Sequence, residues 1–120
     1  MLKLKGPCSI ILAAGESTRM GEIKQLLPWR GKSLLEHAVD AAFGAGIERI
    51  VVVYGAHVEK IEPEIIRLGV DRVYNEDWKL GVGTSIRKGV SHVLEAAPST
   101  DGILIQLADQ PRVTKKELLA

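Results

Sequence analysis

The chain has a single cysteine and only five aromatic residues, two Trp, two Tyr and one Phe, in a length of 120. Cys8 alone can form neither an internal disulfide nor a cysteine-based metal cluster, so we expect a small core residue there. The N-terminus lacks the long apolar stretch and small-residue cleavage site of a secretory signal. The apolar run at residues 10–14 is long enough for one buried strand and much too short to span a membrane. These absences predict a cytoplasmic protein with no membrane partner.

Net charge is also low, at +1 for the whole chain. Its distribution is uneven, because residues 1–33 contain six basic and two acidic side chains. A nucleic-acid surface needs a broad basic stripe interleaved with aromatic side chains, and this chain has too few aromatics to supply one. We therefore expect no nucleic-acid partner, and we expect a small anionic ligand near the N-terminal part of the chain.

Four apolar runs bounded by turn residues predict buried strands, at residues 10–14, 47–54, 70–74 and 102–107. The last of these is expected to be buried on both of its faces. Between the strands, apolar residues recur at helical spacing, and helix-start signals fall at Ser33, near Val58, at Thr84 or Ser85, and at Thr114. In the second helix we expect Pro63 to break or restart the turn, because proline lacks a donor and crowds the preceding residues.

Strands that alternate with helices and read as continuous apolar runs indicate repeated βαβ units. Right-handed crossovers then give an α/β fold with a parallel sheet covered on both faces, in the strand order 3-2-1-4. A chain of this length predicts one domain over residues 1–120. Ligands of such sheets bind outside the carboxyl ends of the strands. The residues that follow the predicted strands should therefore converge on one site, namely the Gly15 loop, Asn75, the Gly83 loop and Asp109.

The stretch after the first strand changes abruptly to small and charged residues. A strand that leads into a glycine loop can direct several backbone N–H groups at a phosphate, and Arg19 and Lys24 add mobile positive charge. The Walker loop is excluded, because its first glycine would fall at Leu26, and no G-x-G-x-x-G fingerprint is present. A triphosphate cradle is one interpretation of this loop, and an ordinary solvated loop between a strand and a helix is the other.

The string LAAGESTRMGEIKQLLPW, from Leu12 to Trp29, resembles the signature of the MobA-like nucleotidyltransferases, in the branch that includes molybdenum cofactor cytidylyltransferase. It matches L-A-[AG]-G-x-x-x-R-[MF]-G-x-x-K at every fixed position. The later segments NEDWKLGVGTS and LADQP are similar to two further family patterns. The resemblance covers residues 7–120, but only about the first two-thirds of the family's domain.

This resemblance implies a Rossmann-like three-layer sandwich of the nucleotide-diphospho-sugar transferase type, truncated at its C-terminus. It implies transfer of a nucleoside monophosphate to a phosphorylated pterin, the molybdenum cofactor, with release of pyrophosphate. CTP is the expected donor and GTP the second choice, because Ala14 stands where guanylyl-transferring relatives usually have Gly. Mg²⁺ is the expected cofactor. An acceptor phosphate is already an anion, so the protein must align the reactants and neutralise charge rather than supply a base.

The resemblance also implies roles for individual residues. Arg19, Lys24 and Asp109 are expected to be catalytic, with Asp109 as the metal ligand. Nucleotide contacts are expected from a larger set: Leu12, Ala13, Ala14, Gly15, Glu16, Ser17, Arg19, Lys24, Asn75, Gly83, Ser85 and Asp109. For several of these residues a purely structural role remains an alternative. Asp109 could merely order the turn before Pro111, and Ser85 could cap a helix. We expect Trp78 to anchor its loop rather than to stack on a base.

Three other functions stay open at this point. A sugar-1-phosphate nucleotidyltransferase has the same succession of a strand, a loop, an arginine and a lysine. Some relatives of this branch are NAD(P)H-linked oxidoreductases, although no dinucleotide fingerprint supports that activity here. The chain could also be a nucleotide-binding module without turnover. If Ala120 is the terminus, the fourth strand has an uncovered edge, which predicts pairing with a second copy of the chain.

Overall fold

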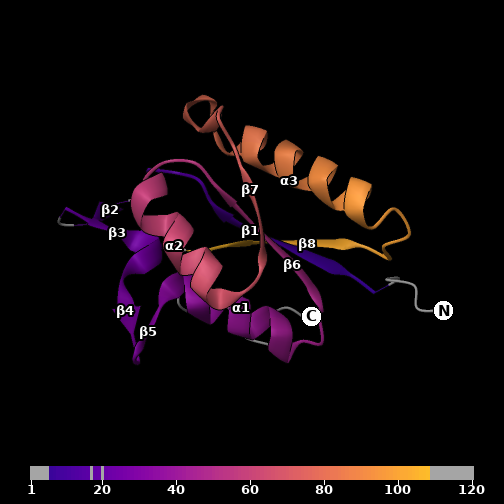
Figure 1. Cartoon of the computed structure of the whole chain (residues 1–120), viewed down its shortest axis with the longest axis horizontal. Coiled ribbons are helices and arrows are strands. Elements are labelled where there is room, and N and C mark those ends of the chain that lie inside the picture. The colour runs from indigo at the N-terminus through magenta and orange to yellow at the C-terminus, as the bar shows by residue number, and fades with distance from the viewer. Residues whose placement is uncertain (1–5, 17, 20, 109–120) are drawn as a thin grey trace.

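The computed structural model describes residues 6–16, 18–19 and 21–108 (Figure 1). Ser17, Asp109 and the helix expected from Thr114 lie outside the described residues, as does the side chain of Arg19. Within the described ranges, no helix combines the length and the apolar character needed to cross a bilayer.

The centre of the molecule is a four-stranded sheet in the order β7-β6-β1-β8. Its strands are β1 (Cys8–Ala13), β6 (Arg49–Tyr54), β7 (Asp71–Tyr74) and β8 (Ile103–Leu107). Every pairing in it is parallel, and Ile10 of β1 lies between Val51 and Ile105. The predicted α/β class and strand order 3-2-1-4 are therefore confirmed. The first observed strand starts two residues before its predicted boundary, and the other three start one or two residues after theirs.

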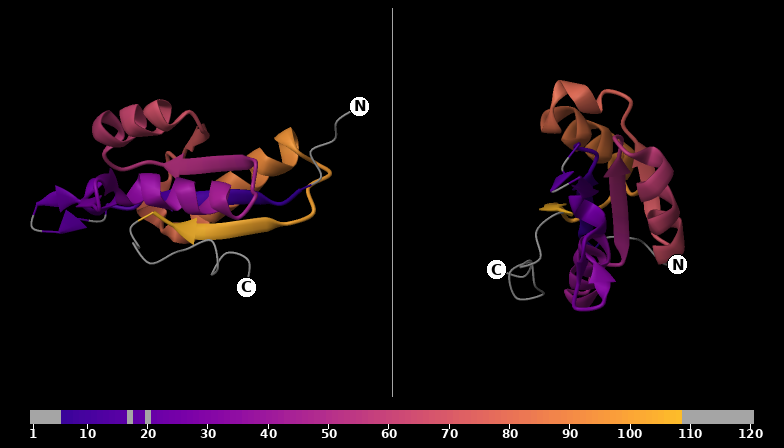
Figure 2. Two further views of the ribbon diagram at one scale, coloured as in Figure 1. Left: turned by 90° about the horizontal axis from the view of Figure 1, so that it is seen from below. Right: turned by 90° about the vertical axis from the view of Figure 1, so that its left-hand side faces the viewer.

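Helices cover both faces of this sheet (Figures 1 and 2). On one face lie α1 (Leu34–Gly44) and α2 (Val58–Leu68), and on the other lies α3 (Val82–Ala96). Alternate residues of β1 separate the two cores accordingly. Ile11 packs in the cluster with α1 and α2, whereas Ile10 packs in the cluster with α3. The result is the expected three-layer sandwich, in which β1 and β6 are buried from both sides.

Short elements that the sequence did not predict lie outside the four-stranded sheet, and Figure 1 shows the two hairpins among them on one side of the molecule. They are the hairpins β2 (Thr18–Arg19) with β3 (Glu22–Ile23) and β4 (Pro28–Trp29) with β5 (Lys32–Ser33), and the 3-10 turns η1 (Lys24–Leu26) and η2 (Trp78–Leu80). Strands of two residues are too short to show an alternating pattern, so periodicity cannot reveal them.

The start of α1 agrees with the predicted cap and also fixes α2. Ser33 accepts a hydrogen bond from the Glu36 backbone N–H at 3.0 Å, and its hydroxyl donates to Glu64 at 2.7 Å. Arg67 then bridges Glu36 and Glu64, at 2.6 and 2.9 Å. The Arg67 hydrogen bond lowers the pKa of Glu64, and the Ser33 hydroxyl adds to this effect. The two helices on this face are thus linked near the end of the molecule where the hairpins lie.

The expectation that Pro63 would break the second helix is wrong, because α2 runs without interruption from Val58 to Leu68. Because Pro63 has no N–H, the Glu59 carbonyl loses its helical hydrogen bond. Pro63 and Glu59 are both exposed, so solvent can replace this bond. Ile61 and Ile65 flank the proline and are fully buried. Packing on both sides of Pro63 therefore holds together a helix that local propensity would interrupt.

The fourth strand also differs from its expectation of burial on both faces. Ile105 and Leu107 point to the α3 side of β8 and are 45% and 40% exposed. On the opposite face Gln106 is buried, and it accepts a hydrogen bond from Ser9 and donates one to the Ala38 carbonyl. Within the described residues β8 is the edge of the sheet, so α3 does not reach across it.

Candidate nucleotide-binding site

A cavity of about 230 Å³ opens at the carboxyl ends of β1 and β8, and we call it the strand-tip pocket. It lies on the α3 side of the sheet, where the sequence predicted convergence of the strand ends. Four segments of the chain line it, through Leu12, Ala14, Gly15, Gln25, Trp78, Gly81, Val82, Ser85 and Leu107.

The end of β1 forms the floor of this pocket. Leu12 and Ala14 face it, whereas the side chain of Ala13 turns into the core with α1 and α2. The Leu12 carbonyl accepts the Ala108 N–H at 3.1 Å, and the Ala14 carbonyl accepts the Ala56 N–H at 3.0 Å. Since these carbonyls already hold the sheet together, the floor offers a ligand mainly apolar side-chain surface.

The glycine loop that follows β1 is held from below by Gln25. This side chain is only 3% exposed, and its Nε2 donates to the Gly15 carbonyl at 3.3 Å. Its Oε1 is buried and has no hydrogen-bond partner among the described residues. Gly15 and Glu16 themselves are exposed. Sequence reasoning missed Gln25, although a polar residue inside the string KQLLP was the signal for it.

Asn75, at the end of β7, is the most buried polar residue near the pocket, with an exposed fraction of 0%. Its Nδ2 donates to the hydroxyls of Ser85 at 2.8 Å and Thr84 at 2.9 Å, and its Oδ1 accepts the Asp77 N–H at 3.0 Å. The structure thus brings the predicted residues Asn75 and Ser85 together. The amide of Asn75 shapes the pocket wall from behind, and Ser85 lines the pocket itself.

The predicted cap of the third helix is wrong. The helix starts at Val82 after Gly81, whose backbone angles (φ 114°, ψ 169°) are open essentially to glycine alone. Thr84 and Ser85 lie inside the first turn, where Asn75 engages both hydroxyls. Thr84 also donates to the Gly81 carbonyl at 2.7 Å. Gly83 is in the same turn, exposed, and outside the lining of the pocket.

Trp78 anchors the loop between β7 and α3, as expected. It packs against the core on the α3 side, and a Cβ added to Gly55 would lie 2.7 Å from the Cβ of Trp78. Gly55 is therefore the residue that allows this close approach. The same indole also lines the strand-tip pocket, so the anchor and one wall of the site are a single side chain.

The charged residues predicted for catalysis are placed less completely. Lys24 begins η1 and is half-buried, and the Arg19 backbone pairs with Glu22 in the β2–β3 hairpin. Asp109 follows Ala108, a buried residue bonded to the end of β1. Ser17 and Asp109 lie outside the described residues.

A family model decides the ancestry of this fold. The family model described as "MobA-like NTP transferase domain" matches residues 9–120. The chain belongs to this family. The resemblance carried by the Leu12–Trp29 string is thereby confirmed at the family level.

Individual MobA-like relatives carry different names. The chain is 35% identical over 108 residues to nicotine blue oxidoreductase of Paenarthrobacter nicotinovorans, which is 88% of this chain and 51% of that protein. It is 46% identical over 81 residues to bifunctional protein GlmU of Caulobacter vibrioides, which is 65% of this chain and 18% of that protein. The chain thus spans about half the length of the first relative and less of the second.

Solved structures agree with the family and with the fold. Rv0371c from Mycobacterium tuberculosis H37Rv superimposes with a TM-score of 0.80 at 31% identity, over 97% of this chain and 58% of that one. A nucleotidyl transferase from Methanothermobacter thermautotroptrophicus gives a TM-score of 0.77 at 29% identity, over 93% and 54%. One crystal structure of Rv0371c is a complex with manganese, with a TM-score of 0.72 at 30% identity.

Within the described ranges, no three His, Cys, Asp or Glu side chains gather in a way that could hold a metal ion. Mg²⁺ does not need such a cluster, because it is commonly held by one or two carboxylates together with substrate phosphates and water. Asp109, the carboxylate expected to hold the metal, follows Ala108 in the sequence and lies outside the described residues.

Proposed function

We propose that the protein of which this MobA-like domain is part transfers a nucleoside monophosphate from a nucleoside triphosphate to a phosphorylated acceptor, releasing pyrophosphate. The observation that carries the proposal is the strand-tip pocket, which lies directly beside the exposed Gly15 loop. A base-sized cavity adjoining a glycine loop is the arrangement that a nucleotide requires.

In this proposal the residues of the Gly15 loop bind the phosphates through backbone N–H groups, from Ala14 to Ser17. Arg19 and Lys24 neutralise charge on the α-phosphate and on the departing pyrophosphate. Asp109 would hold Mg²⁺, which when bound supplies neutralisation of the phosphate charge. The acceptor is itself a phosphate anion, so the main task of the protein is alignment of the two reactants.

We propose CTP as the donor, with GTP second. The strand-tip pocket is small, about 230 Å³, against the roughly 300–1,000 Å³ typical of small-molecule sites. A pyrimidine suits such a pocket better than a purine does. Two polar groups could read the base: the Ser85 hydroxyl, held by Asn75, and the buried Gln25 Oε1, which accepts a hydrogen bond from a donor such as an amino group.

The proposed acceptor is a phosphorylated pterin, the molybdenum cofactor, and this rests on the resemblance of the Leu12–Trp29 string to the cytidylyltransferase branch. Pairing of two chains through the edge of β8 likewise stays a prediction, which light scattering of the purified chain tests. The names of the relatives support one competing function. Nicotine blue oxidoreductase, 35% identical, is named as an oxidoreductase, so NADPH is a necessary competitor in any binding test.

The experiment is a thermal shift series with CTP, GTP and NADPH, each with and without Mg²⁺, followed by an assay of pyrophosphate release with candidate acceptors. We expect the melting temperature to rise most with CTP and Mg²⁺. Val82→Trp should remove this rise, because Val82 is 60% exposed at the rim and a larger side chain there fills the pocket without entering the core. Val82→Ala is the matched control. A shift with NADPH alone would favour the oxidoreductase instead.

A further inference from the structure

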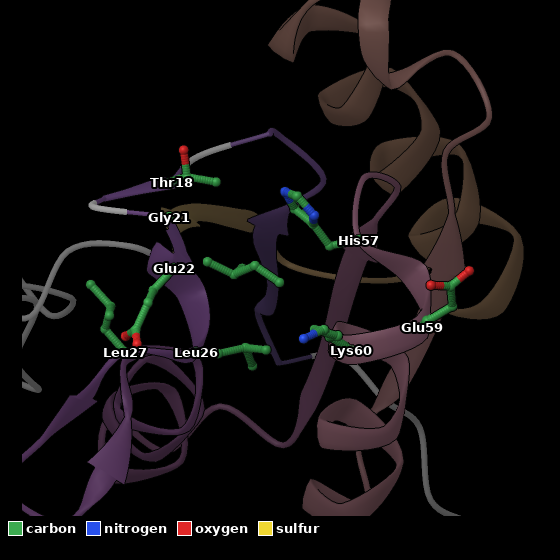
Figure 3. Close-up of a pocket in the computed structure, with 9 residues that line it drawn as sticks. Thr18, Gly21, Glu22, Leu26, Leu27, His57, Glu59 and Lys60 are labelled. Carbon is green, nitrogen blue, oxygen red and sulfur yellow. The ribbon is translucent and has the colours of Figure 1, made fainter.

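A second and larger cavity, of about 540 Å³, lies between the β2–β3 hairpin and the start of α2 (Figure 3). We call it the hairpin cavity. It shares no lining residue with the strand-tip pocket. Ile23 and Leu26, which line it, pack against the core of α1 and α2, whereas the strand-tip pocket borders the core of α3. The two cavities therefore border cores on opposite faces of the sheet.

One wall of the hairpin cavity is basic. His57 and Lys60 reach from the start of α2 toward the hairpin (Figure 3). The Nε2 atom of His57 is buried and has no hydrogen-bond partner among the described residues. Lys60 is exposed and takes part in none of the ion pairs found among those residues. Both side chains thus have hydrogen-bonding capacity that the protein does not use.

The backbone at this wall adds to the same preference. His57 precedes α2 with left-handed angles (φ 59°, ψ 37°), and α2 has no side-chain cap. Its carbonyl accepts the N–H groups of Lys60 and Ile61, at 3.0 and 2.9 Å. The N–H groups of the first turn, at Val58 and Glu59, belong to the set that a helix leaves without internal partners. Such donors favour an anion when side chains already gather positive charge beside them.

The remaining walls determine the rest of the ligand. Ile23, Leu26 and Leu27 supply apolar surface to the lining. Leu26 and Leu27 lie on the side opposite His57 and Lys60, and Thr18 supplies a hydroxyl at one end (Figure 3). Two carboxylates also belong to the lining. Glu59 points away from the cavity, and the carboxylate of Glu22 extends down the hairpin side, away from His57 and Lys60 (Figure 3). The anionic and cationic groups are therefore separated within the cavity.

We propose that the hairpin cavity is a second binding site, which takes a small organic phosphate with an apolar body. The phosphate would be bound by His57, Lys60 and the first turn of α2, and the apolar body would pack on Ile23, Leu26 and Leu27. A carboxylate offers the same charge with fewer acceptor oxygens, so it is the weaker ligand of the same class. The cavity shares no lining residue with the strand-tip pocket, and the proposal does not rest on the nucleotide proposed for that pocket.

The test uses the 120-residue chain, labelled with ¹⁵N, and phenyl phosphate as the probe. We expect saturable shifts in the amide signals of Val58 and Glu59 at millimolar probe. Lys60→Gln and His57→Asn should each weaken this binding about tenfold, the loss expected when one hydrogen bond to a charged group is removed. Asn tolerates the left-handed angles of residue 57, so the variant should fold. Lys88→Gln, on α3, is the control and should bind like the unmodified chain.

Benzoate separates the two anions, and we expect it to bind more weakly than phenyl phosphate at the same amide signals. Absence of saturable shifts, or shifts confined to Leu12, Ser85 and Leu107, would overturn the proposal. Competition by CTP with Mg²⁺ provides a further arm. If CTP displaces the probe, the cavity is part of the nucleotide site and the second site is disproved. If CTP fails to bind at all while the probe still binds, only the proposed nucleotide function fails.

Discussion

One amide group, that of Asn75, makes hydrogen bonds to three neighbours, the farthest of them ten residues along the chain. Because the residue is completely buried, water cannot replace the bonds that it makes. The Ser85 hydroxyl and the Asp77 N–H would both lose their partner if the amide were removed. The shape of the strand-tip pocket therefore depends on a residue that does not line it.

We predict that Asn75→Ala lowers the free energy of unfolding by about 2–4 kcal/mol, the cost of a small cavity together with buried groups left unpaired. Urea denaturation measures this change. Asp77→Ala is the control, because the exposed Asp77 side chain makes no cap bond and only its backbone contacts Asn75. It should stay within about 0.5 kcal/mol of the unmodified chain. Equal stability of both variants would contradict the role given to the amide.

At Arg19 the expected effect is on chemistry rather than on folding. Arg19→Ala should reduce turnover about 10²–10³-fold, as loss of a charge-stabilising donor commonly does, with an unchanged melting temperature. The reason is that Arg19 lies in a two-residue strand of a small hairpin rather than in the sheet. Steady-state pyrophosphate release gives the rate. Arg30→Ala, in the other hairpin, should leave the rate unaltered. Unchanged turnover in Arg19→Ala would remove its assigned role.

At the scale of elements, the distance between α3 and the sheet is set by Gly89. A Cβ at this position would lie 2.8 Å from Ile10 Cγ2 and 3.0 Å from Val53 Cγ2, so the helix backbone packs directly on side chains of β1 and β6. Gly83 is in the same helix, and a Cβ there would meet no atom within 4 Å. The two glycines thus form a matched pair in one element.

We predict that Gly89→Ala destabilises the protein by about 1–3 kcal/mol, because α3 must move away from the sheet. Gly83→Ala should be neutral or stabilising by up to about 1 kcal/mol, since it only removes backbone freedom from a helix. Chemical denaturation of both variants provides the measurement. If Gly89→Ala were as stable as Gly83→Ala, the close packing of α3 would be disproved.

The elements themselves were largely predictable, because buried strands and amphipathic helices leave clear periodic patterns. The exceptions have physical causes. The backbone angles of Gly81 start α3 earlier than its hydroxyl residues suggested, and burial of Ile61 and Ile65 keeps α2 intact across Pro63. The convergence of strand ends was predicted from topology. The buried Gln25 and the cavity beside His57 were not, since each depends on side-chain packing between segments far apart in the chain.

At the scale of the whole molecule, two separate cores share a single sheet, and Ile11 and Ile10 of β1 belong to one each. Because both cores contain residues of β1, separation of either core exposes one face of this strand and weakens its packing in the other core. We therefore predict that the described part of the chain unfolds as one unit, as a single domain would.

We predict that two probes of different faces report the same urea midpoint. In Trp29→Phe the remaining fluorescence comes from Trp78, which packs with the α3 core, while circular dichroism follows all helices. Coincident curves are expected. A fluorescence midpoint well below that of circular dichroism would show that the α3 layer separates first, and would count against a single cooperative domain.

The segment 55–57 has a consequence that concerns both cavities. Gly55 lies under the indole that walls one of them, and His57, two residues later, forms the basic wall of the other. A ligand that shifts this tripeptide from either side changes the free energy available to a ligand on the opposite side. By linkage the effect is mutual, so each ligand would alter the dissociation constant of the other by the same factor.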